Sequence, residues 1–422
     1  MQRLAILSLH TSPLAQPGTG DGGGMNVYVR ELASGLARIG NHCDVFTRAD
    51  EPGDVGSVMV EPGFVVHRVE AGPRGPVAKE QLEALVPEFT DRVLTAMTTP
   101  SGGPISEIDG GPYDALHANY WLSGLVGHTI KHELDLPLVS TFHTLEKVKA
   151  GAGAGGASAE RSRRRAHAEA TVIGCSDAVL ASCAVELDQL VELYGADVGR
   201  VAVIAPGVDH AFFAPGDAHQ ARRAVGLPEG GPVLLFVGRI QPLKGAHVAV
   251  ETLAQLRGIG LDASLVVIGG PSGDEGEATL RDLHERAKAL RIAPHVYFRP
   301  PQAHELLSSY YRAADVTVVP SRSESFGLVA LESLACGTPV VASAVGGLTT
   351  LVDDGRTGAL VEGWDPVAYA KAVAGIIDEP IRATRYSTAA VLEAQRYTWR
   401  TTATQLSDLF SSLVARRLVS CS

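Results

Sequence analysis

The chain has 422 residues, with 36 lysines and arginines against 47 aspartates and glutamates, and a formal net charge of −11. This length suggests two or three domains, and the 45% hydrophobic content excludes disorder over most of the chain. The acidic balance argues against nucleic acid as a partner. No apolar run approaches the ~18 residues of a membrane helix, and the run from Leu4 to Leu7 is too short for a signal peptide. We expect a cytoplasmic protein that binds small molecules, and we leave a homodimer open.

The cysteines are scattered and form no C-x-x-C pair. This spacing is not typical of a zinc site or a disulfide framework. We therefore expect buried, reduced thiols and no metal site. The five cysteines are Cys43, Cys175, Cys183, Cys336 and Cys421.

Short aliphatic runs alternate with amphipathic stretches, which indicates βαβ units and a largely parallel sheet in an α/β fold. The expected strand–helix–strand units, in chain order, are Arg3 to Leu9, Met25 to Ile39 and His42 to Thr47; Tyr113 to His117, Trp121 to His132 and Pro137 to Thr141; and Val233 to Gly238, Gly245 to Arg257 and Ala263 to Ile268.

Two Pro-Gly pairs, Pro206-Gly207 and Pro215-Gly216, interrupt this alternation. We interpret residues 206–217 as a hinge linker between two doubly wound domains, 1–205 and 218–397. Residues 398–422 are expected to form a helix that returns to the first domain. A second irregular stretch, 150–159, is almost all Gly, Ala and Ser. A mobile loop over a site and a tolerated surface insertion both fit it.

Residues Gly18 to Gly23 match G-x-G-x-x-G, but about ten residues separate them from the preceding strand. In the dinucleotide fingerprint the glycines follow the strand directly. A nicotinamide-dependent oxidoreductase, with Asp44 as the ribose-binding acid, is therefore a minor alternative. We favour a loop from Gly22 to Asn26 that enters a helix at Met25 and turns its amides toward a phosphate.

Arg239 and Lys244 follow the strand that begins at Val233, at the end where α/β domains bind ligands. Two cations at this position suit a diphosphate, which needs charge neutralisation. Solvated surface charge is the alternative, but Pro242 and the flanking glycines stiffen the loop.

Glu324 and Glu332 are separated by seven residues, and the sequence from Phe326 onward predicts a helix. The amides of Ser325 to Leu328 would then form an anion cradle at the helix N-terminus. Glu332 lies on an apolar face, where an acid is usually paired or functional. Accepting hydrogen bonds from paired ribose hydroxyls is its natural use.

His117, Tyr120 and His143 lie near the ends of successive predicted strands. A lone histidine at a strand end is more often structural. Three such residues facing one cleft favour a site.

The Glu-x7-Glu segment, the Gly-Arg-x4-Lys loop and the glycine-rich first loop resemble the retaining GT-B glycosyltransferases of family 4, over nearly the whole chain. The segments His10 to Asp21, Gly23 to Tyr28, Tyr120 to Gly124 and His143 to Leu145, with Val148-Lys149, are similar to those of the members that glycosylate inositol phosphate in mycothiol synthesis. The resemblance implies two Rossmann-like domains facing a central cleft. It also implies transfer of N-acetylglucosamine from UDP-GlcNAc to inositol phosphate, with retention of configuration.

Site residues follow from this resemblance, position by position. Glu324 would bind the donor sugar, Glu332 the ribose, and His143 would support the transferred sugar. Arg163 and Arg164 are alternatives to Arg165. Implied catalytic residues are His143, Arg239, Lys244 and Glu324. Implied donor-binding residues are Gly24, Arg239, Lys244, Ser325, Phe326, Gly327, Leu328 and Glu332. Implied acceptor-binding residues are His10, Asn26, Lys79, Tyr120, Thr144 and Arg165.

No D-x-D triplet occurs in the chain, which fits a site where cations and not a divalent metal stabilise the leaving diphosphate. We therefore expect no cofactor beyond the donor substrate. A sucrose-phosphate synthase-like enzyme with another phosphorylated acceptor is the runner-up. A lipid-acceptor transferase is disfavoured because we see no basic amphipathic surface helix.

Overall fold

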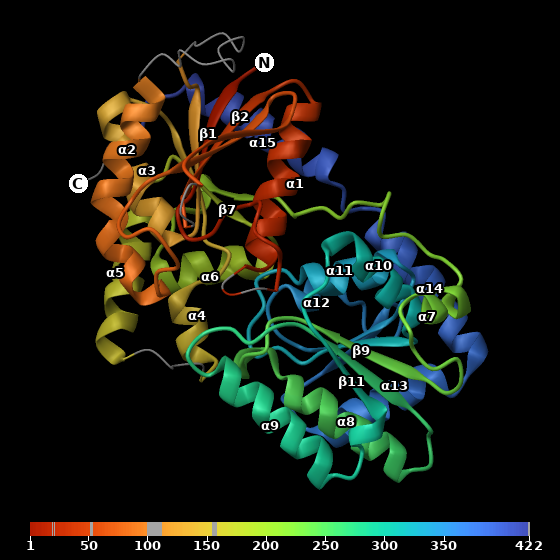
Figure 1. Cartoon of the computed structure of the whole chain (residues 1–422). Helices are drawn as coiled ribbons and strands as arrows, with labels where there is room; N and C mark the ends of the chain where they lie inside the picture. Colours follow the sequence, from red (N-terminus) through yellow and green to blue (C-terminus); the bar gives the residue numbers. More distant parts are fainter. Residues whose placement is uncertain (19, 21, 51–53, 99–111, 154–157, 421–422) are drawn as a thin grey trace. The chain divides into compact units, whose positions relative to one another are not determined.

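The computed structural model describes residues 1–18, 20, 22–50, 54–98, 112–153 and 158–420. The chain divides into two compact units (Figure 1). The first comprises Met1–Ala15, Met25–Ala205 and Trp399–Ser422. The second comprises Gln16–Gly24 and Pro206–Thr398.

The first unit is built on a sheet with the order β3-β4-β2-β1-β5-β6-β7-β8, in which only the β3–β4 pair is antiparallel among the described residues. Strand β1 lies between β2 and β5. Strands β2 to β4 are on one side of it, and β5 to β8 are on the other. The strands are β1 Arg3–Ser8, β2 His42–Arg48, β3 Gly56–Glu61, β4 Phe64–Val69, β5 Ala115–Asn119, β6 Leu138–Thr141, β7 Ala178–Ala181 and β8 Val201–Val203.

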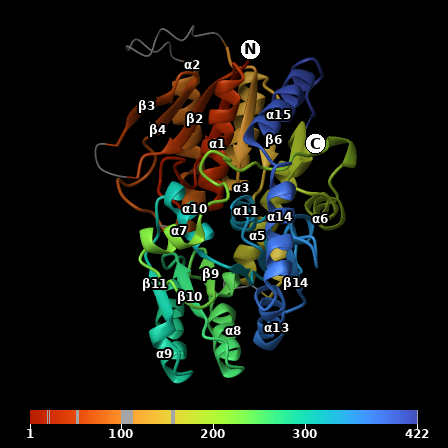
Figure 2. The same cartoon turned by 90° about the vertical axis from the view of Figure 1, so that its right-hand side faces the viewer.

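Helices cover both faces of this sheet because its strands are apolar on both sides. Leu4 and Ile6 of β1 belong to a core with α1 and α15, whereas Ala5 and Leu7 belong to a core with α2, α3, α5 and α6. Helix α15, although last in the chain, packs beside α1 (Figure 2). The helices are α1 Gly24–Arg38, η1 Lys79–Leu85, α2 Val86–Thr98, α3 Trp121–Leu134, α4 Glu146–Gly151, α5 Ala159–Cys175, α6 Ala184–Tyr194, η2 Val198–Arg200 and α15 Trp399–Val414.

The second unit is built on a parallel sheet with the order β11-β10-β9-β12-β13-β14. Helices α8, α9 and α13 share a hydrophobic core with this sheet. The strands are β9 Val233–Val237, β10 Ser264–Ile268, β11 Val296–Arg299, β12 Val316–Val319, β13 Val340–Ser343 and β14 Gly358–Val361. The helices are α7 Ala218–Ala224, η3 Pro242–Lys244, α8 Ala246–Gly258, α9 Gly276–Ala289, η4 Ala293–His295, α10 His304–Ala313, α11 Leu328–Ala335, α12 Leu348–Leu351, α13 Pro366–Ile377 and α14 Pro380–Ala394.

The expected fold class, two doubly wound α/β domains, is confirmed. One helix start was wrong: α11 begins at Leu328 and not at Phe326. Gly327 precedes it with a φ of 105°, a left-handed conformation that favours glycine, so the chain turns sharply before the helix.

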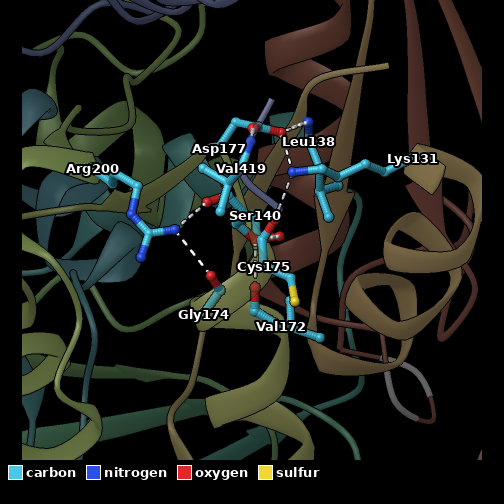
Figure 3. Close-up of polar contacts among 10 residues, drawn as sticks. Lys131, Leu138, Ser140, Val172, Gly174, Cys175, Asp177, Arg200 and Val419 are labelled. Atoms are coloured by element: carbon cyan, nitrogen blue, oxygen red, sulfur yellow. Dashed lines mark hydrogen bonds and ion pairs between the residues drawn. The ribbon is translucent and has the colours of Figure 1, made fainter. Parts of the chain in front are cut away.

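The C-terminal segment docks on the first unit at Asp177 (Figure 3). The Asp177 carboxylate accepts hydrogen bonds from the amides of Val419 and Leu138, at 2.7 and 2.8 Å, and from Lys131 Nζ at 2.7 Å. Next to it, Cys175 is disulfide-bonded, so the expectation that all cysteines are reduced was wrong. The spacing of the cysteines could not show that the C-terminal segment lies beside Asp177. Cys421 lies outside the described residues, as do Thr19, Asp21 and residues 154–157 of the predicted loops.

In the portion of the chain that the structure describes, no helix is long and apolar enough to cross a membrane.

Candidate active site

Each sheet has one point where the strand order reverses, between β1 and β5 in the first unit and between β9 and β12 in the second. Open α/β sheets bind ligands outside the carboxyl ends of the strands at such points. Polar residues singled out from the sequence follow these very strands. Tyr120 follows β5, Arg239 and Lys244 follow β9, and Glu324 follows β12.

In the second unit, the reversal point brings Lys244 and Glu324 together. Lys244 Nζ lies 2.6 Å from Glu324 Oε2, and the two side chains are 24% and 20% exposed. An ammonium carries three N–H donors, and the pair is partly exposed to solvent. Lys244 can therefore donate to Glu324 and to a ligand oxygen at the same time. The position fits a diphosphate leaving group.

The glycine-rich segment Gln16–Gly24 groups with this same unit. The Gln16 side chain donates a hydrogen bond to the Pro301 carbonyl at 3.2 Å. A Cβ on Gly23 would lie 3.3 Å from Arg239 Nε, so the backbone there approaches the guanidinium as only glycine comfortably allows. Gly24, the first residue of α1, lies against Leu328.

The expected anion cradle is displaced by the late start of α11. Ser325 and Phe326 precede the helix in a loop, and Phe326 is buried against the Tyr397 ring, with 5.7 Å between ring centroids. Gly347 donates its amide to the Glu324 carbonyl at 3.0 Å and fixes this loop. The amides nearest the N-terminus of α11 therefore belong to Leu328 and the residues after it.

Glu332 is buried and paired. Its Oε1 lies 2.7 Å from His304 Nε2, and its Oε2 accepts a hydrogen bond from the buried Tyr311 hydroxyl at 2.8 Å. Each carboxylate oxygen has a second lone pair, so these contacts orient the group and leave it able to accept from hydroxyls.

In the first unit, cations surround Tyr120. Lys79 Nζ and Arg165 Cζ each lie 5.1 Å from the centre of its ring. Burial alone would raise the pKa of Tyr120, but Lys79, Arg165 and Lys149 outweigh it and hold the pKa below its ordinary value. No described residue has hydrogen-bonding geometry to its buried hydroxyl, although Trp121 lies close enough to lower the pKa. The hydroxyl is therefore a strong donor available to an anion.

Arg165 connects this cluster to Thr144. Its Nη2 donates to the Thr144 carbonyl at 2.8 Å and to the Thr144 hydroxyl at 3.1 Å. It also pairs with Glu169 at 2.8 Å and with Glu146 at 3.2 Å. Of the two alternatives in sequence, Arg164 pairs instead with Glu83 on the surface.

Lys79 has no carboxylate within 4 Å among the residues that the structure describes. Burial, followed by the charges of Arg165 and Lys79, lowers the pKa of Lys149. Three cations, Lys79, Lys149 and Arg165, thus face two carboxylates, Glu146 and Glu169, which leaves one excess positive charge around Tyr120.

His143 and His117 form a neutral pair of rings near the same strand ends. His143 Nε2 lies 2.9 Å from Asn119 Oδ1, and His117 Nε2 lies 2.9 Å from the Thr141 hydroxyl. Burial lowers the pKa of both histidines to about 3, and His117 adds to the effect on His143. His143 is therefore neutral near pH 7, where its ring can form hydrogen bonds.

Backbone conformation singles out two of these positions. Tyr120 has a φ of 77° and His143 a φ of 61°. Residues other than glycine adopt this region at a cost, and such strain gathers at ligand sites.

The two remaining acceptor candidates are His10, which follows β1, and Asn26, which lies on α1. The His10 ring lies 5.0 Å from the Tyr120 ring. Asn26 is buried and donates its side-chain amide to the Thr11 hydroxyl at 2.8 Å. The structure thus brings His10, Lys79, Tyr120, Thr144 and Arg165 together, with Asn26 held through Thr11.

Asp44 does not fit the nicotinamide alternative. Its carboxylate is buried and accepts a hydrogen bond from the Tyr113 hydroxyl at 2.8 Å. It also pairs with Arg3 at 3.0 Å and with His67 at 2.8 Å. Arg3 is the first residue of β1, so this network lies at the amino ends of the strands, opposite the ligand edge.

Two of the residues that support the site could be read from the sequence. Glu169 lies one helical turn after Arg165, the spacing of an ion pair, and Lys149 lies in one of the segments that carry the resemblance. His304 and Tyr311 carried no signal, because only the tertiary fold brings them to Glu332.

The fold and the two groups of residues define the class of two-domain GT-B glycosyltransferases. A model described as Glycosyl transferases group 1 matches residues 217–392, and a Glycosyl transferase 4-like domain matches residues 23–207. The chain is 47% identical to a D-inositol 3-phosphate glycosyltransferase 2 of Catenulispora acidiphila, covering 97% of this chain and 95% of the relative.

A D-inositol 3-phosphate glycosyltransferase of Acidothermus cellulolyticus is 45% identical, over 99% of this chain and 91% of the relative. Among solved structures, a sucrose-phosphate synthase from Thermosynechococcus elongatus superposes with a TM-score of 0.88 at 32% identity, covering 98% of this chain and all of that one. The chain belongs to the family of glycosyltransferases that the two matching family models and the D-inositol 3-phosphate glycosyltransferases represent.

Proposed function

We propose that this protein transfers N-acetylglucosamine from UDP-GlcNAc to 1D-myo-inositol 3-phosphate in the cytoplasm, with retention at the anomeric carbon. The observation that carries the proposal is the cluster around Tyr120, where Lys79, Arg165 and Thr144 supply donors suited to phosphate oxygens. The names of the curated relatives at 45–47% identity support the same acceptor.

The donor half lies in the second unit. Arg239 and Lys244 would neutralise the diphosphate as it leaves, and Glu324, held by Lys244, would contact the donor sugar. Glu332, oriented by His304 and Tyr311, would accept hydrogen bonds from the ribose. Preorganised cations aimed at developing charge supply a large part of such catalysis.

Retention needs no carboxylate nucleophile in this scheme. The bond between the anomeric carbon and the diphosphate oxygen breaks as the inositol oxygen approaches the same face. The departing phosphate oxygen takes the proton of the inositol hydroxyl. Neutral His143 would hydrogen-bond the transferred sugar, and the cations replace a divalent metal.

A panel of donors against acceptors, with products identified by mass spectrometry and their anomeric configuration by NMR, tests the proposal. We expect product from UDP-GlcNAc and inositol 3-phosphate. Efficient product formation from a hexose phosphate and none from inositol 3-phosphate would favour the sucrose-phosphate synthase-like alternative, which the 32% identical structure represents.

A further inference from the structure

The acceptor cluster rests on one carboxylate that does not itself reach Tyr120. Glu169 of α5 is fully buried. Its Oε1 accepts from Arg165 Nε at 2.8 Å, and its Oε2 accepts from the Glu146 amide at 2.9 Å and from the Tyr194 hydroxyl. A buried charge needs such donors, because an uncompensated one is costly in the protein interior. Glu169 therefore joins three elements, α4, α5 and α6, at one point.

Glu169 also fixes the start of α4. Glu146 is the first residue of that helix, where backbone amides lack intrahelical partners, and Glu169 satisfies this one. The next amide, that of Lys147, donates to the Tyr194 hydroxyl at 3.0 Å. Lys149 follows less than one turn later. The same carboxylate thus sets both the plane of the Arg165 guanidinium and the helix that carries Lys149.

We infer that Glu169, held by Tyr194, is a positioning residue for the phosphate of the acceptor. This inference rests on the proposed function. Arg165 has its Nε on Glu169 and its Nη2 on Thr144, so the guanidinium is fixed from two sides before any ligand arrives. Preorganisation of this kind removes the ordering cost that a free arginine side chain would incur on binding.

Charge and geometry predict opposite effects of removing this carboxylate. Neutralising Glu169 raises the excess positive charge around Tyr120 from one to two, so electrostatics alone would tighten phosphate binding. Loss of the anchor frees Arg165 and the start of α4, so positioning predicts weaker binding. The sign of the change therefore distinguishes the two.

The test compares wild type with Glu169→Gln, which keeps the size of the side chain. Calorimetric titration with inositol 3-phosphate and with inorganic phosphate should show Kd raised about tenfold or more, the usual scale for one charged hydrogen bond. The KM for inositol 3-phosphate should rise in parallel, while kcat at saturation and the KM for UDP-GlcNAc change little. Glu169→Asp, which restores the charge, should recover part of the loss.

Two further variants serve as controls. Glu160→Gln removes an exposed carboxylate from the first turn of the same helix and should leave phosphate binding unchanged. If Glu169→Gln does not fold, Tyr194→Phe, which removes one donor to Glu169, should weaken phosphate binding in the same direction.

Tighter or unchanged phosphate binding in folded Glu169→Gln would overturn the inference while leaving the proposed function intact. Equal loss for inositol 3-phosphate and free inositol would show a merely structural role and would also overturn it. A wild type that binds neither inositol 3-phosphate nor inorganic phosphate would overturn the proposed function and the inference with it.

Discussion

Replacing Lys244 by alanine tests the donor half of the site. The change removes one ammonium from the place proposed for the leaving diphosphate, where its Nζ now lies 2.6 Å from Glu324. Loss of one preorganised contact to developing charge typically costs about 2.7–4 kcal/mol in the transition state, which corresponds to a fall of about 10²–10³-fold in kcat. Arg239→Ala should behave alike.

Stability should change far less than activity. Because both side chains of the Lys244–Glu324 pair remain partly exposed, the pair contributes about 1 kcal/mol or less to folding. In a unit of this size that corresponds to a shift in Tm of a few degrees at most, about 2–4 °C. The exposed Lys288 of α9, changed to alanine, is a matched control that should keep full activity.

The assay is steady-state release of UDP at saturating acceptor, with Tm from calorimetry on the same samples. Glu324→Gln removes the carboxylate that pairs with Lys244. A large loss of kcat in this variant, without a similar loss in Lys244→Ala, would separate sugar binding by Glu324 from diphosphate binding by Lys244. A kcat within tenfold of wild type for both Lys244→Ala and Arg239→Ala would refute the assignment of the diphosphate.

Three other predictions concern the acceptor, metal ions and acid stability. Lys79→Ala should lower kcat/KM for inositol 3-phosphate about tenfold or more while leaving free inositol unaffected, since only the phosphate contact is removed; an equal loss for both acceptors would contradict this. Activity should persist in EDTA; complete loss that magnesium or manganese restores would show a required metal. In the folded protein the pKa of His117 is about 3, whereas its ordinary value is 6.5. As the pH falls, His117 is therefore protonated in the unfolded chain before it is protonated in the folded protein. The free energy of unfolding then falls by about 1.4 kcal/mol per pH unit from pH 6.5 toward 3. Urea unfolding of His117→Gln should show a pH slope shallower by about one proton, and an unchanged slope would mean that His117 does not titrate this way.

The parallel sheets could be predicted from the sequence. Buried strands appear as short continuous apolar runs, whereas in the helices between them the apolar residues recur with the helical period. The strand ends were placed well enough to locate Tyr120 and Lys244 on ligand edges, whereas the strand before Glu324 was not among the predicted units. The start of α11 was misplaced because the apolar run continues through Phe326, which in fact packs on Tyr397, a residue far away in sequence.

Some supporting residues were out of reach for a similar reason. Glu332 was expected to be paired or functional, but its partners His304 and Tyr311 lie on another helix and could not be identified from the sequence. The disulfide at Cys175 could not be read from the sequence either, because the cysteines are scattered and form no C-x-x-C pair. No periodicity in the sequence encodes such contacts.

The central claim is that the first unit recognises a phosphorylated acceptor. The most direct test is the ratio of kcat/KM for inositol 3-phosphate to that for free inositol, measured on the wild-type protein with UDP-GlcNAc. One or more charged hydrogen bonds to the phosphate, each worth about 1.5–3 kcal/mol, predict a ratio of about 10² or higher. Equal use of both acceptors would contradict the phosphate site around Tyr120 and, with it, the inositol phosphate assignment.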